Sequence, residues 1–170
     1  MSETEHAAIS VVVPVYNGVG TLDELVSRVD TVLEGTDHEF VLVNDGSTDE
    51  TWHRMVELSR SNPRVRGLDL MRNYGQHNAL LAGIRAASHP ITITLDHDLQ
   101  NPPEEIPKLL AELKAGADVV YGAAEEPAFG LWRNLATRLT KFALRGVIGN
   151  RVASQVSAFR AFRTDLRGTF

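Results

Sequence analysis

Two aspartates, Asp96 and Asp98, stand one residue apart at the end of a strand-like run, ITITLD over 91–96. An unpaired carboxylate is costly to bury, so such a pair needs a compensating positive charge. Carboxylate oxygens suit a hard divalent cation, Mg²⁺ or Mn²⁺, and Mg²⁺ commonly joins one or two carboxylates to substrate phosphates. The pair therefore predicts a metal site that receives a diphosphate-bearing substrate. The alternative is that both aspartates cap the following helix, although Asn101 is better placed to do so.

Three further polar clusters follow strand-like runs: PVYNG at 14–18, NDGSTD at 44–49 and RNYGQHN at 72–78. The fourth is DHDLQ at 96–100, which contains the aspartate pair. In open α/β sheets, ligands bind outside the carboxyl ends of the strands. Each cluster alone reads as a turn or a capped helix, but their shared position predicts one site at one edge of a sheet.

The elements that must position these clusters alternate between strand-like and helix-like patterns. We expect strands at 9–15, 39–45, 65–70, 91–96 and 118–123, and helices at 21–34, 47–61, 75–88 and after Asn101. Capping boxes, Thr21 with Glu24 and Ser47 with Glu50, predict the starts of the first two helices. Alternating strands and helices predict a mostly parallel sheet covered on both faces.

Composition narrows the class of protein. With 170 residues, 43% hydrophobic and 23% charged, the chain reads as one globular domain, and the lack of cysteine excludes disulfides and thiolate metal sites. The N-terminus is acidic and unlike a secretory signal, and no apolar run approaches the roughly 18 residues of a membrane helix. The sequence has no GxGxxG after the first strand, no Walker lysine motif and no GxSxG elbow. His77 and His97 lie among the polar clusters, whereas the other four histidines read as surface residues.

Charge is unevenly distributed along the chain. The net charge is −5, yet seven Lys and Arg and no Asp or Glu occur between Pro127 and Thr164, which leaves −12 on the remainder. An acidic body with a basic final quarter predicts that the last part meets an anionic partner. The alternative is a basic helix face in water. We expect the boundary between the two parts at 124–130.

Together these motifs resemble glycosyltransferase family 2 with the GT-A fold. The similarity runs from about Ile9 to Phe162, and RNYGQHNALLAG followed by TLDHDLQNPPEEIPKL is most similar to the polyprenyl-phosphate branch. That branch includes dolichol-phosphate mannosyltransferases and undecaprenyl-phosphate sugar transferases of the glucose and aminoarabinose types. The resemblance implies a Rossmann-like α/β fold with a mostly parallel central sheet. It implies a single domain over 1–170, with a nucleotide-sugar-binding body at 1–123 and a basic segment facing acceptor or membrane at 124–170.

The resemblance also implies roles for individual residues. The nucleotide-sugar donor would be held by Pro14, Tyr16, Asn17, Asp45, Arg72, Gln76, Asp96 and His97. The metal ion, Mg²⁺ or Mn²⁺, would be gathered by Asp96, Asp98 and Gln100. The acceptor phosphate would meet Arg133, Arg138, Ser157 and Arg160. Catalytic roles fall to Asp98, Ser157 and Arg160.

The chain departs from the family pattern at four places. Gly18 stands where Glu is frequent, Asn44 replaces the first Asp of Asp-Asp-Gly-Ser, and His97 replaces a common Ala. After the fifth strand, Gly122 is followed by two alanines where the family commonly reads Gly-Ser-Arg. Without that arginine, a phosphate contact must come from elsewhere, for example Arg133 or Arg138.

The acid-free segment bears on the acceptor. A phosphomonoester is largely dianionic at pH 7, so a phosphate acceptor needs cations to position it rather than a general base. The segment 131–149 forms a cationic amphipathic pattern with Trp132 and Phe142, which is typical of membrane-surface helices. The alternative is a helix packed on the sheet with its basic side in water.

The function expected is therefore metal-dependent, inverting transfer of a sugar from a UDP-, GDP- or dTDP-linked donor to a polyprenyl phosphate. The expected location is the cytoplasmic face of a membrane, as in cell-envelope biogenesis, with membrane helices following the present chain. Alternatives are a polysaccharide or soluble hydroxyl acceptor, or a catalytically silent nucleotide-sugar-binding module. No nucleic acid is expected as a partner, and a homo-oligomer is one alternative for the assembly.

Overall fold

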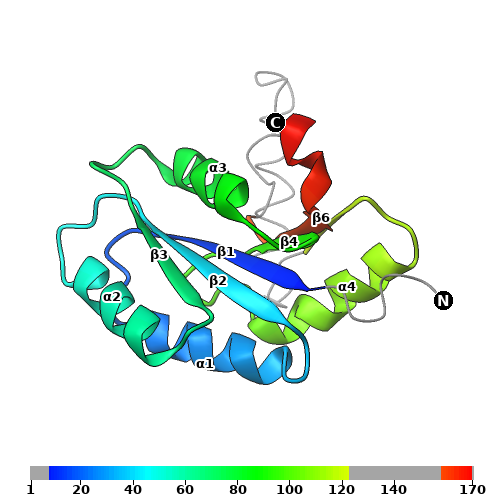
Figure 1. Ribbon diagram of the computed structural model, residues 1–170, viewed down its shortest axis with the longest axis horizontal. Helices are drawn as coiled ribbons and strands as arrows, with labels where there is room; N and C mark the ends of the chain where they lie inside the picture. Colours follow the sequence, from blue (N-terminus) through cyan, green and yellow to red (C-terminus); the bar gives the residue numbers. More distant parts are fainter. Residues whose placement is uncertain (1–7, 123–157, 170) are drawn as a thin grey trace, which may run out of the picture. The chain divides into compact units, whose positions relative to one another are not determined.

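The computed structural model describes residues 8–122 and 158–169, which build one six-stranded sheet with helices around it (Figure 1). The strands are β1 (Ile9–Val15), β2 (His38–Asn44), β3 (Val65–Asp69), β4 (Ile91–Thr94), β5 (Val119–Tyr121) and β6 (Arg160–Arg163). The helices are α1 (Leu22–Val32), α2 (Thr51–Ser61), α3 (Gln76–Ala86) and α4 (Ile106–Lys114), with 3₁₀ helices η1 (Pro103–Glu105) and η2 (Thr164–Thr169). The five predicted strands and four predicted helices are confirmed, with bounds that differ by a few residues.

The sheet has the strand order β3-β2-β1-β4-β6-β5. β1 pairs in parallel with β2 and β4, and β2 pairs in parallel with β3, so the predicted mostly parallel α/β fold is confirmed. The carboxyl ends of these four strands consequently meet at one edge. β6 was not predicted: it lies between β4 and β5 and is antiparallel to both.

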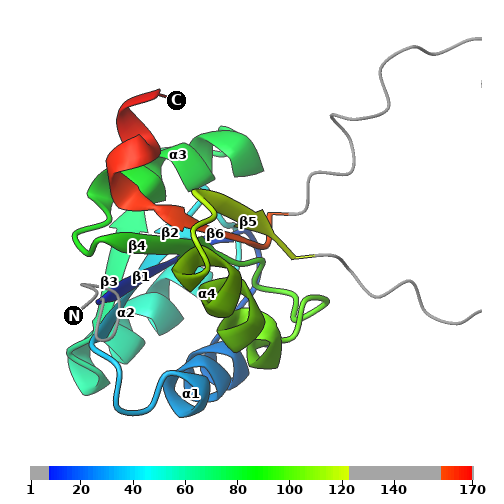
Figure 2. The same ribbon diagram turned by 90° about the vertical axis from the view of Figure 1, so that its right-hand side faces the viewer.

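The two faces of the sheet carry different helices. In β1, Val11, Val13 and Val15 belong to the cluster packed with α1, α2 and α4, whereas Val12 belongs to the cluster packed with α3. This alternation follows from the two-residue period of a strand. Figures 1 and 2 show α3 on one side of the sheet and α1, α2 and α4 on the other. On the α3 side, the backbones approach so closely that a Cβ on Gly83 would lie 2.4 Å from Val12 Cγ1.

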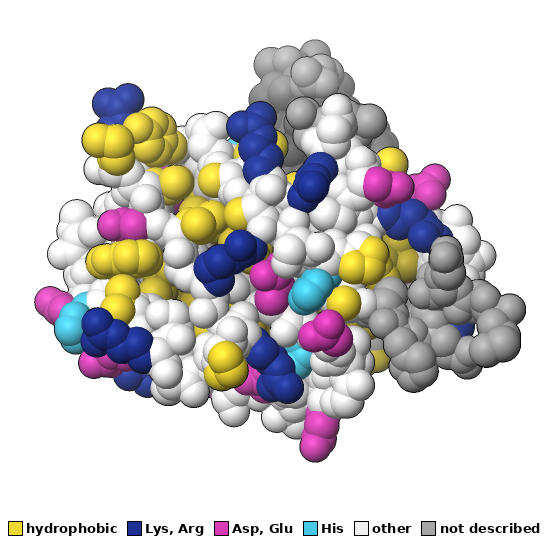
Figure 3. Space-filling view, in the orientation of Figure 1, with side chains coloured by type: hydrophobic (Ala, Val, Ile, Leu, Met, Phe, Trp, Pro, Cys, Tyr) yellow, Lys and Arg dark blue, Asp and Glu magenta, His cyan; other side chains and the backbone are white. Residues whose placement is uncertain are grey.

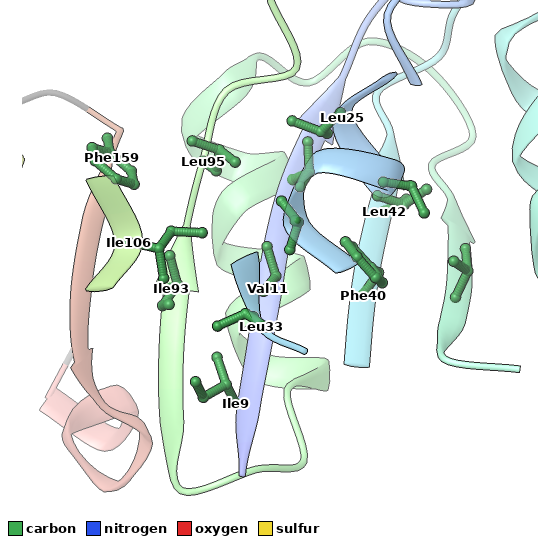
Figure 4. Close-up of a cluster of buried hydrophobic side chains, with 14 of the residues drawn as sticks. Ile9, Val11, Leu25, Leu33, Phe40, Leu42, Ile93, Leu95, Ile106 and Phe159 are labelled. Carbon is green, nitrogen blue, oxygen red and sulfur yellow. The ribbon is translucent and has the colours of Figure 1, made fainter. Parts of the chain in front are cut away.

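The larger core cluster gives the sheet its rigidity. Figure 4 shows Val11, Phe40 and Ile93 on three adjacent strands, with Leu25 of α1 and Ile106 of α4 beside them. All five side chains are fully buried. Burying a side chain of this size stabilises a fold by about 1.5–3 kcal/mol, so the edge where these strands end is firmly held.

The predicted capping boxes are wrong. Thr21 precedes α1, but its hydroxyl donates to the carbonyl of Gly18 (3.1 Å) instead of capping the helix. Ser47 lies before α2 begins and accepts a hydrogen bond from the backbone N–H of Asn17 (3.0 Å). Asn101 is not a cap either, because η1 begins two residues later, after an extended residue. Both hydroxyls instead satisfy backbone groups of loops, Thr21 within its own loop and Ser47 in the neighbouring one, and such groups also need partners when water is excluded.

Within 8–122 and 158–169, no helix is long and apolar enough to cross a membrane. The expected boundary at 124–130, the amphipathic segment 131–149, and the expected acceptor residues Arg133, Arg138 and Ser157 lie outside the described residues.

Candidate functional site

A pocket of about 330 Å³ opens at the carboxyl edge of the parallel strands. Its lining comes from the end of β1, the loops after β1, β2, β3 and β4, and the start of α3: Pro14, Val15, Tyr16, Asp45, Asn73, Gly75, Gln76, Asp96, His97 and Asp98. Seven of the residues expected to bind donor or metal are thereby brought together. Asn17, Arg72 and Gln100 belong to the same loops but are not part of the lining.

The two aspartates of the DHD motif occupy different surroundings. Asp96 accepts a hydrogen bond from Gln76 Nε2 at 2.6 Å, whereas Asp98 is exposed and accepts one from the backbone N–H of Gln100 at 3.1 Å. Burial raises the pKa of Asp96 above its ordinary value, the charge of Asp98 adds to this rise, and His97 opposes it. A second positive charge near the pair would therefore stabilise its ionised form.

Among the described residues, no basic side chain supplies this positive charge. No Lys or Arg in this part of the chain forms an ion pair with Asp96 or Asp98. No group of three or more His, Asp or Glu gathers around one point there. Two carboxylates, with the side-chain oxygen of Gln100 close in sequence, fit a hard cation that takes its remaining ligands from phosphates and water.

The loop after β1 is tied to the loop after β2. Asn17 has a left-handed backbone (φ 50°), and its Oδ1 accepts a hydrogen bond from the backbone N–H of Thr48 at 2.9 Å. The backbone N–H of Gly18 donates to Thr51 Oγ1 at 2.9 Å. The amide oxygen of Asn17 thus holds the neighbouring loop.

The loop after β2 is tied in turn to the loop after β3. Asp45 is only 2% exposed, and its two carboxylate oxygens accept the backbone N–H groups of Tyr74 (2.7 Å) and Gly75 (2.9 Å). Gly46 has a φ of 65°, and a Cβ there would lie 2.4 Å from the carbonyl carbon of Arg72. Only glycine allows the two backbones to lie so close.

Two departures from the family pattern meet in space. A Cβ on Gly18 would lie 2.7 Å from Nδ1 of His97, so the missing side chain at 18 makes room for the imidazole. His97 Nδ1 also lies 3.4 Å from Thr21 Oγ1. Because the Thr21 hydroxyl already donates to a carbonyl, it accepts from the imidazole in this contact. This contact joins the DHD loop to the loop after β1.

Exposed apolar side chains surround the same edge of the sheet. Among the described residues, the large hydrophobic side chains that are exposed are Tyr16, Val19, Met71, Tyr74 and Tyr121, and all five follow or end a strand at the carboxyl edge. The Arg72 guanidinium stacks over the Tyr74 ring at 4.9 Å from its centroid. The face seen in Figure 3 carries exposed hydrophobic side chains among interspersed Lys, Arg, Asp and Glu.

Arg160, the first residue of β6, is not part of the pocket lining but pairs with the strand that leads into the DHD loop. It is opposite Thr94, the last residue of β4, and the Thr94 hydroxyl donates to the carbonyl of Ala158. Its Nε is buried, yet no acceptor for it occurs in 8–122 or 158–169. A buried guanidinium N–H without a partner is costly, which indicates that a ligand or a residue outside these ranges satisfies it.

Sequence reasoning missed several residues of the site. Asn73 and Gly75 line the pocket, and Thr21 and Thr51 hold its loops. Gly75 carried a signal, since a glycine at the start of the predicted helix 75–88 allows a positive φ, and the structure gives it a φ of 90°. Thr21 reads as a helix cap in the sequence, and its contact with His97 spans 76 residues. Thr51 carried no signal, because Gly18 lies 33 residues away in the sequence.

The fold and the pocket define the class: a Rossmann-like α/β sheet of the GT-A type, with a carboxylate-lined pocket at the strand ends. Residues 10–167 match the profile of Glycosyl transferase family 2, and the chain belongs to that family.

Solved structures agree with this assignment. Glucosyl-3-phosphoglycerate synthase from Mycobacterium tuberculosis, crystallised with Mn²⁺, UDP and phosphoglyceric acid, is 26% identical with a TM-score of 0.65 over 94% of this chain and 57% of that one. The mannosyltransferase PcManGT from Pyrobaculum calidifontis, solved with GDP-Man and Mn²⁺, is 23% identical, with a TM-score of 0.59 over 71% of this chain and 36% of that one. TarS (1–349) from S. aureus is 20% identical, with a TM-score of 0.62 over 95% of this chain and 48% of that one. The last two show the fold alone, and the chain spans little more than half the length of the first.

Proposed function

We propose that this chain transfers a sugar, with inversion, from a nucleoside-diphosphate donor to a polyprenyl phosphate at the cytoplasmic face of a membrane. The observation that carries the donor half is the carboxylate pair in the pocket, which lacks a cationic partner among the described residues. A divalent cation and the diphosphate that it neutralises would complete this charge arrangement.

On the donor side, Pro14 and Tyr16 would offer an apolar wall for the base, while Asp96 and Asp98, which line the same pocket, would hold the cation near the diphosphate. Mg²⁺ or Mn²⁺ would supply positive charge where the nucleoside diphosphate departs. Gln76 orients Asp96 through its 2.6 Å hydrogen bond. The pocket with its cation would thus stabilise the negative charge that develops on the departing nucleoside diphosphate during transfer.

On the acceptor side, the proposal rests on Arg160 at the rim. Its buried Nε has no acceptor in the described ranges, and a guanidinium matches phosphate oxygens well. A phosphate acceptor with a second pKa of about 6 is already an anionic nucleophile at pH 7. The exposed tyrosines and Met71 around the same edge are side chains suited to a membrane–water boundary, which favours a lipid-linked acceptor.

The test is sugar transfer to undecaprenyl phosphate in mixed micelles with Mn²⁺, using UDP-, GDP- and dTDP-linked donors in turn and mass spectrometry of the lipid. We expect product from undecaprenyl phosphate and none from undecaprenol, which has the same chain without phosphate. Asp98→Ala should abolish transfer, whereas Asp118→Ala, an exposed carboxylate at the opposite edge, should retain it. Equal transfer to both lipids would refute the acceptor assignment.

A second candidate is transfer to a soluble acceptor. The similarity to glucosyl-3-phosphoglycerate synthase, whose structure holds phosphoglyceric acid, favours a small phosphorylated acid over other soluble acceptors. Transfer to 3-phosphoglycerate with no transfer to the lipid would support it. Donor binding without hydrolysis or transfer would instead indicate a silent nucleotide-sugar-binding module.

A further inference from the structure

Four loops around the pocket are linked to one another in a closed ring of contacts. Asn17 joins the β1 loop to the β2 loop, and Asp45 joins the β2 loop to the β3 loop. Gln76 joins the start of α3 to the β4 loop through Asp96, and His97 joins the β4 loop to the β1 loop through Thr21. A ligand that enters the pocket therefore meets side chains whose positions depend on one another.

Within this ring, Asp45 and Asp96 are coupled through three consecutive residues. Asp45 accepts the N–H groups of Tyr74 and Gly75, and the next residue, Gln76, begins α3 and donates to Asp96 Oδ1. The path consists of two hydrogen bonds from backbone N–H groups to the Asp45 carboxylate, one peptide unit and one hydrogen bond between side chains.

The details at Asp45 show that its carboxylate is used as a structural anchor. It is 2% exposed, and each of its oxygens takes a different backbone N–H at 2.7–2.9 Å. Both donors lie at the N-terminal end of α3, where a negative charge is also favoured by the helix dipole. The anchored loop otherwise has little burial, since residues 71–74 are exposed.

We propose that Asp45 is a positioning residue for the metal site. By fixing the start of α3 it places the Gln76 amide on Asp96 Oδ1, which leaves Asp96 Oδ2 for the cation. This proposal deepens the proposed function and rests on it for the identity of the ligands, a divalent cation with a nucleoside diphosphate. It differs from the role implied by family resemblance, in which Asp45 contacts the base or ribose directly.

The two roles make opposite predictions for a double-mutant cycle. If Asp45 acts through Gln76, removing Gln76 removes most of the effect of changing Asp45. If Asp45 binds the nucleoside, the two losses are independent and add. Outer partners of metal-ligating carboxylates typically change metal affinity by about 10–100-fold.

The experiment is titration of the full chain with Mn²⁺ alone, and separately with UDP, GDP and dTDP in the presence of saturating Mn²⁺. We expect Asp45→Asn and Gln76→Leu each to weaken Mn²⁺ binding by about tenfold, and the double variant to be no more than about twofold weaker than Gln76→Leu. The matched control is Asp69→Asn, a carboxylate at the same edge that binds Asn44 outside the pocket and should leave Mn²⁺ affinity unchanged. Thermal unfolding midpoints establish that each variant folds.

Other outcomes overturn the proposal. Additive losses, or a loss confined to nucleotide affinity, would assign Asp45 a direct nucleoside contact instead. If Asp45→Asn fails to fold, an unchanged Mn²⁺ affinity in Gln76→Leu overturns the proposal, as does a wild-type chain that binds no Mn²⁺. Because Mn²⁺ binding needs no acceptor, a chain that shows this coupling yet transfers no sugar would refute the proposed function alone.

Discussion

At Gly46 the loop after β2 lies against the loop after β3 with no room for a side chain, so alanine there should destabilise the fold. Gly46 and Gly35 both have left-handed backbones, with φ of 65° and 79°. A Cβ at Gly46 would lie 2.4 Å from the carbonyl carbon of Arg72 and 2.4 Å from the amide nitrogen of Asn73, whereas a Cβ at Gly35 would meet nothing within 4 Å. The pair of alanine variants therefore separates steric overlap from backbone strain.

Gly46→Ala should destabilise the fold more than Gly35→Ala, because only the former adds steric overlap to backbone strain. Alanine in the left-handed region costs about 1–2 kcal/mol, partly offset by about 0.4–1 kcal/mol from the reduced entropy of the unfolded chain. Gly35→Ala should therefore destabilise the fold by about 1 kcal/mol. Gly46→Ala adds an overlap with backbone atoms that cannot rotate away, and overpacking of this kind costs about 1–3 kcal/mol more. We expect a total of about 2–4 kcal/mol.

The measurement is urea unfolding at pH 7 followed by far-ultraviolet circular dichroism, with the two variants compared at equal slope. Mn²⁺ affinity provides the functional readout, because displacement of Arg72 and Asn73 would move the start of α3. Gly46→Ala should weaken Mn²⁺ binding, and Gly35→Ala should not. Free energies of unfolding that agree within about 0.5 kcal/mol would refute the argument from close approach.

Three other perturbations test the fold and the loop contacts. Burial, the largest single influence, raises the pKa of Glu39, but hydrogen bonds from two serines and the charge of an arginine outweigh it, so the pKa is lowered. The stability that Glu39 contributes is thus fully present above its unfolded pKa of about 4.3 and is lost as the pH falls through its pKa in the folded protein. In Glu39→Gln, the free energy of unfolding should therefore fall less steeply as the pH is lowered. Gly83→Ala places a Cβ 2.4 Å from Val12 and 3.0 Å from Val43, and should lower stability by about 1–3 kcal/mol in urea unfolding, with an unchanged midpoint contradicting the packing described. Asn17→Ala should destabilise more than Asn17→Gly, because only alanine resists the φ of 50°; the reverse order in thermal unfolding would count against this.

The parallel part of the sheet was accessible from sequence because its signals are local. ISVVVPV and EFVLVND are continuous apolar runs, as expected of strands buried on both faces, and each ends in a polar cluster. The common edge then follows from parallel pairing, which is why the sequence alone predicts that Asp96, Asp98, Asp45 and Tyr16 lie together, and all four line the pocket.

The remaining features depend on contacts between distant parts of the chain. Asn17 and Asp45 read as ligand-binding residues, but their side chains hold backbone groups 29–31 residues away. Thr21 and Ser47 have the sequence of helix caps, yet the Thr21 hydroxyl donates to the carbonyl of Gly18, and Ser47 Oγ accepts the backbone N–H of Asn17. Local pattern cannot rank these partners, because a hydroxyl satisfies a helix end and a neighbouring loop equally well.

The position of β6 separates the order of the strands in space from their order along the chain. β5 is made before β6 but pairs only with it, so β5 has no neighbour in the sheet until residues 160–163 emerge and insert beside β4. A nascent chain that reaches only β5 would contain both aspartates but lack the core residues Phe159, Ala161 and Phe162. Its β4 would present an open hydrogen-bonding edge, which favours pairing with another molecule. Insertion of β6 thus covers the edge of β4 and places Arg160 in the fold at the same time. An incomplete chain without β6 would expose that edge to aggregation and would lack the Arg160 guanidinium.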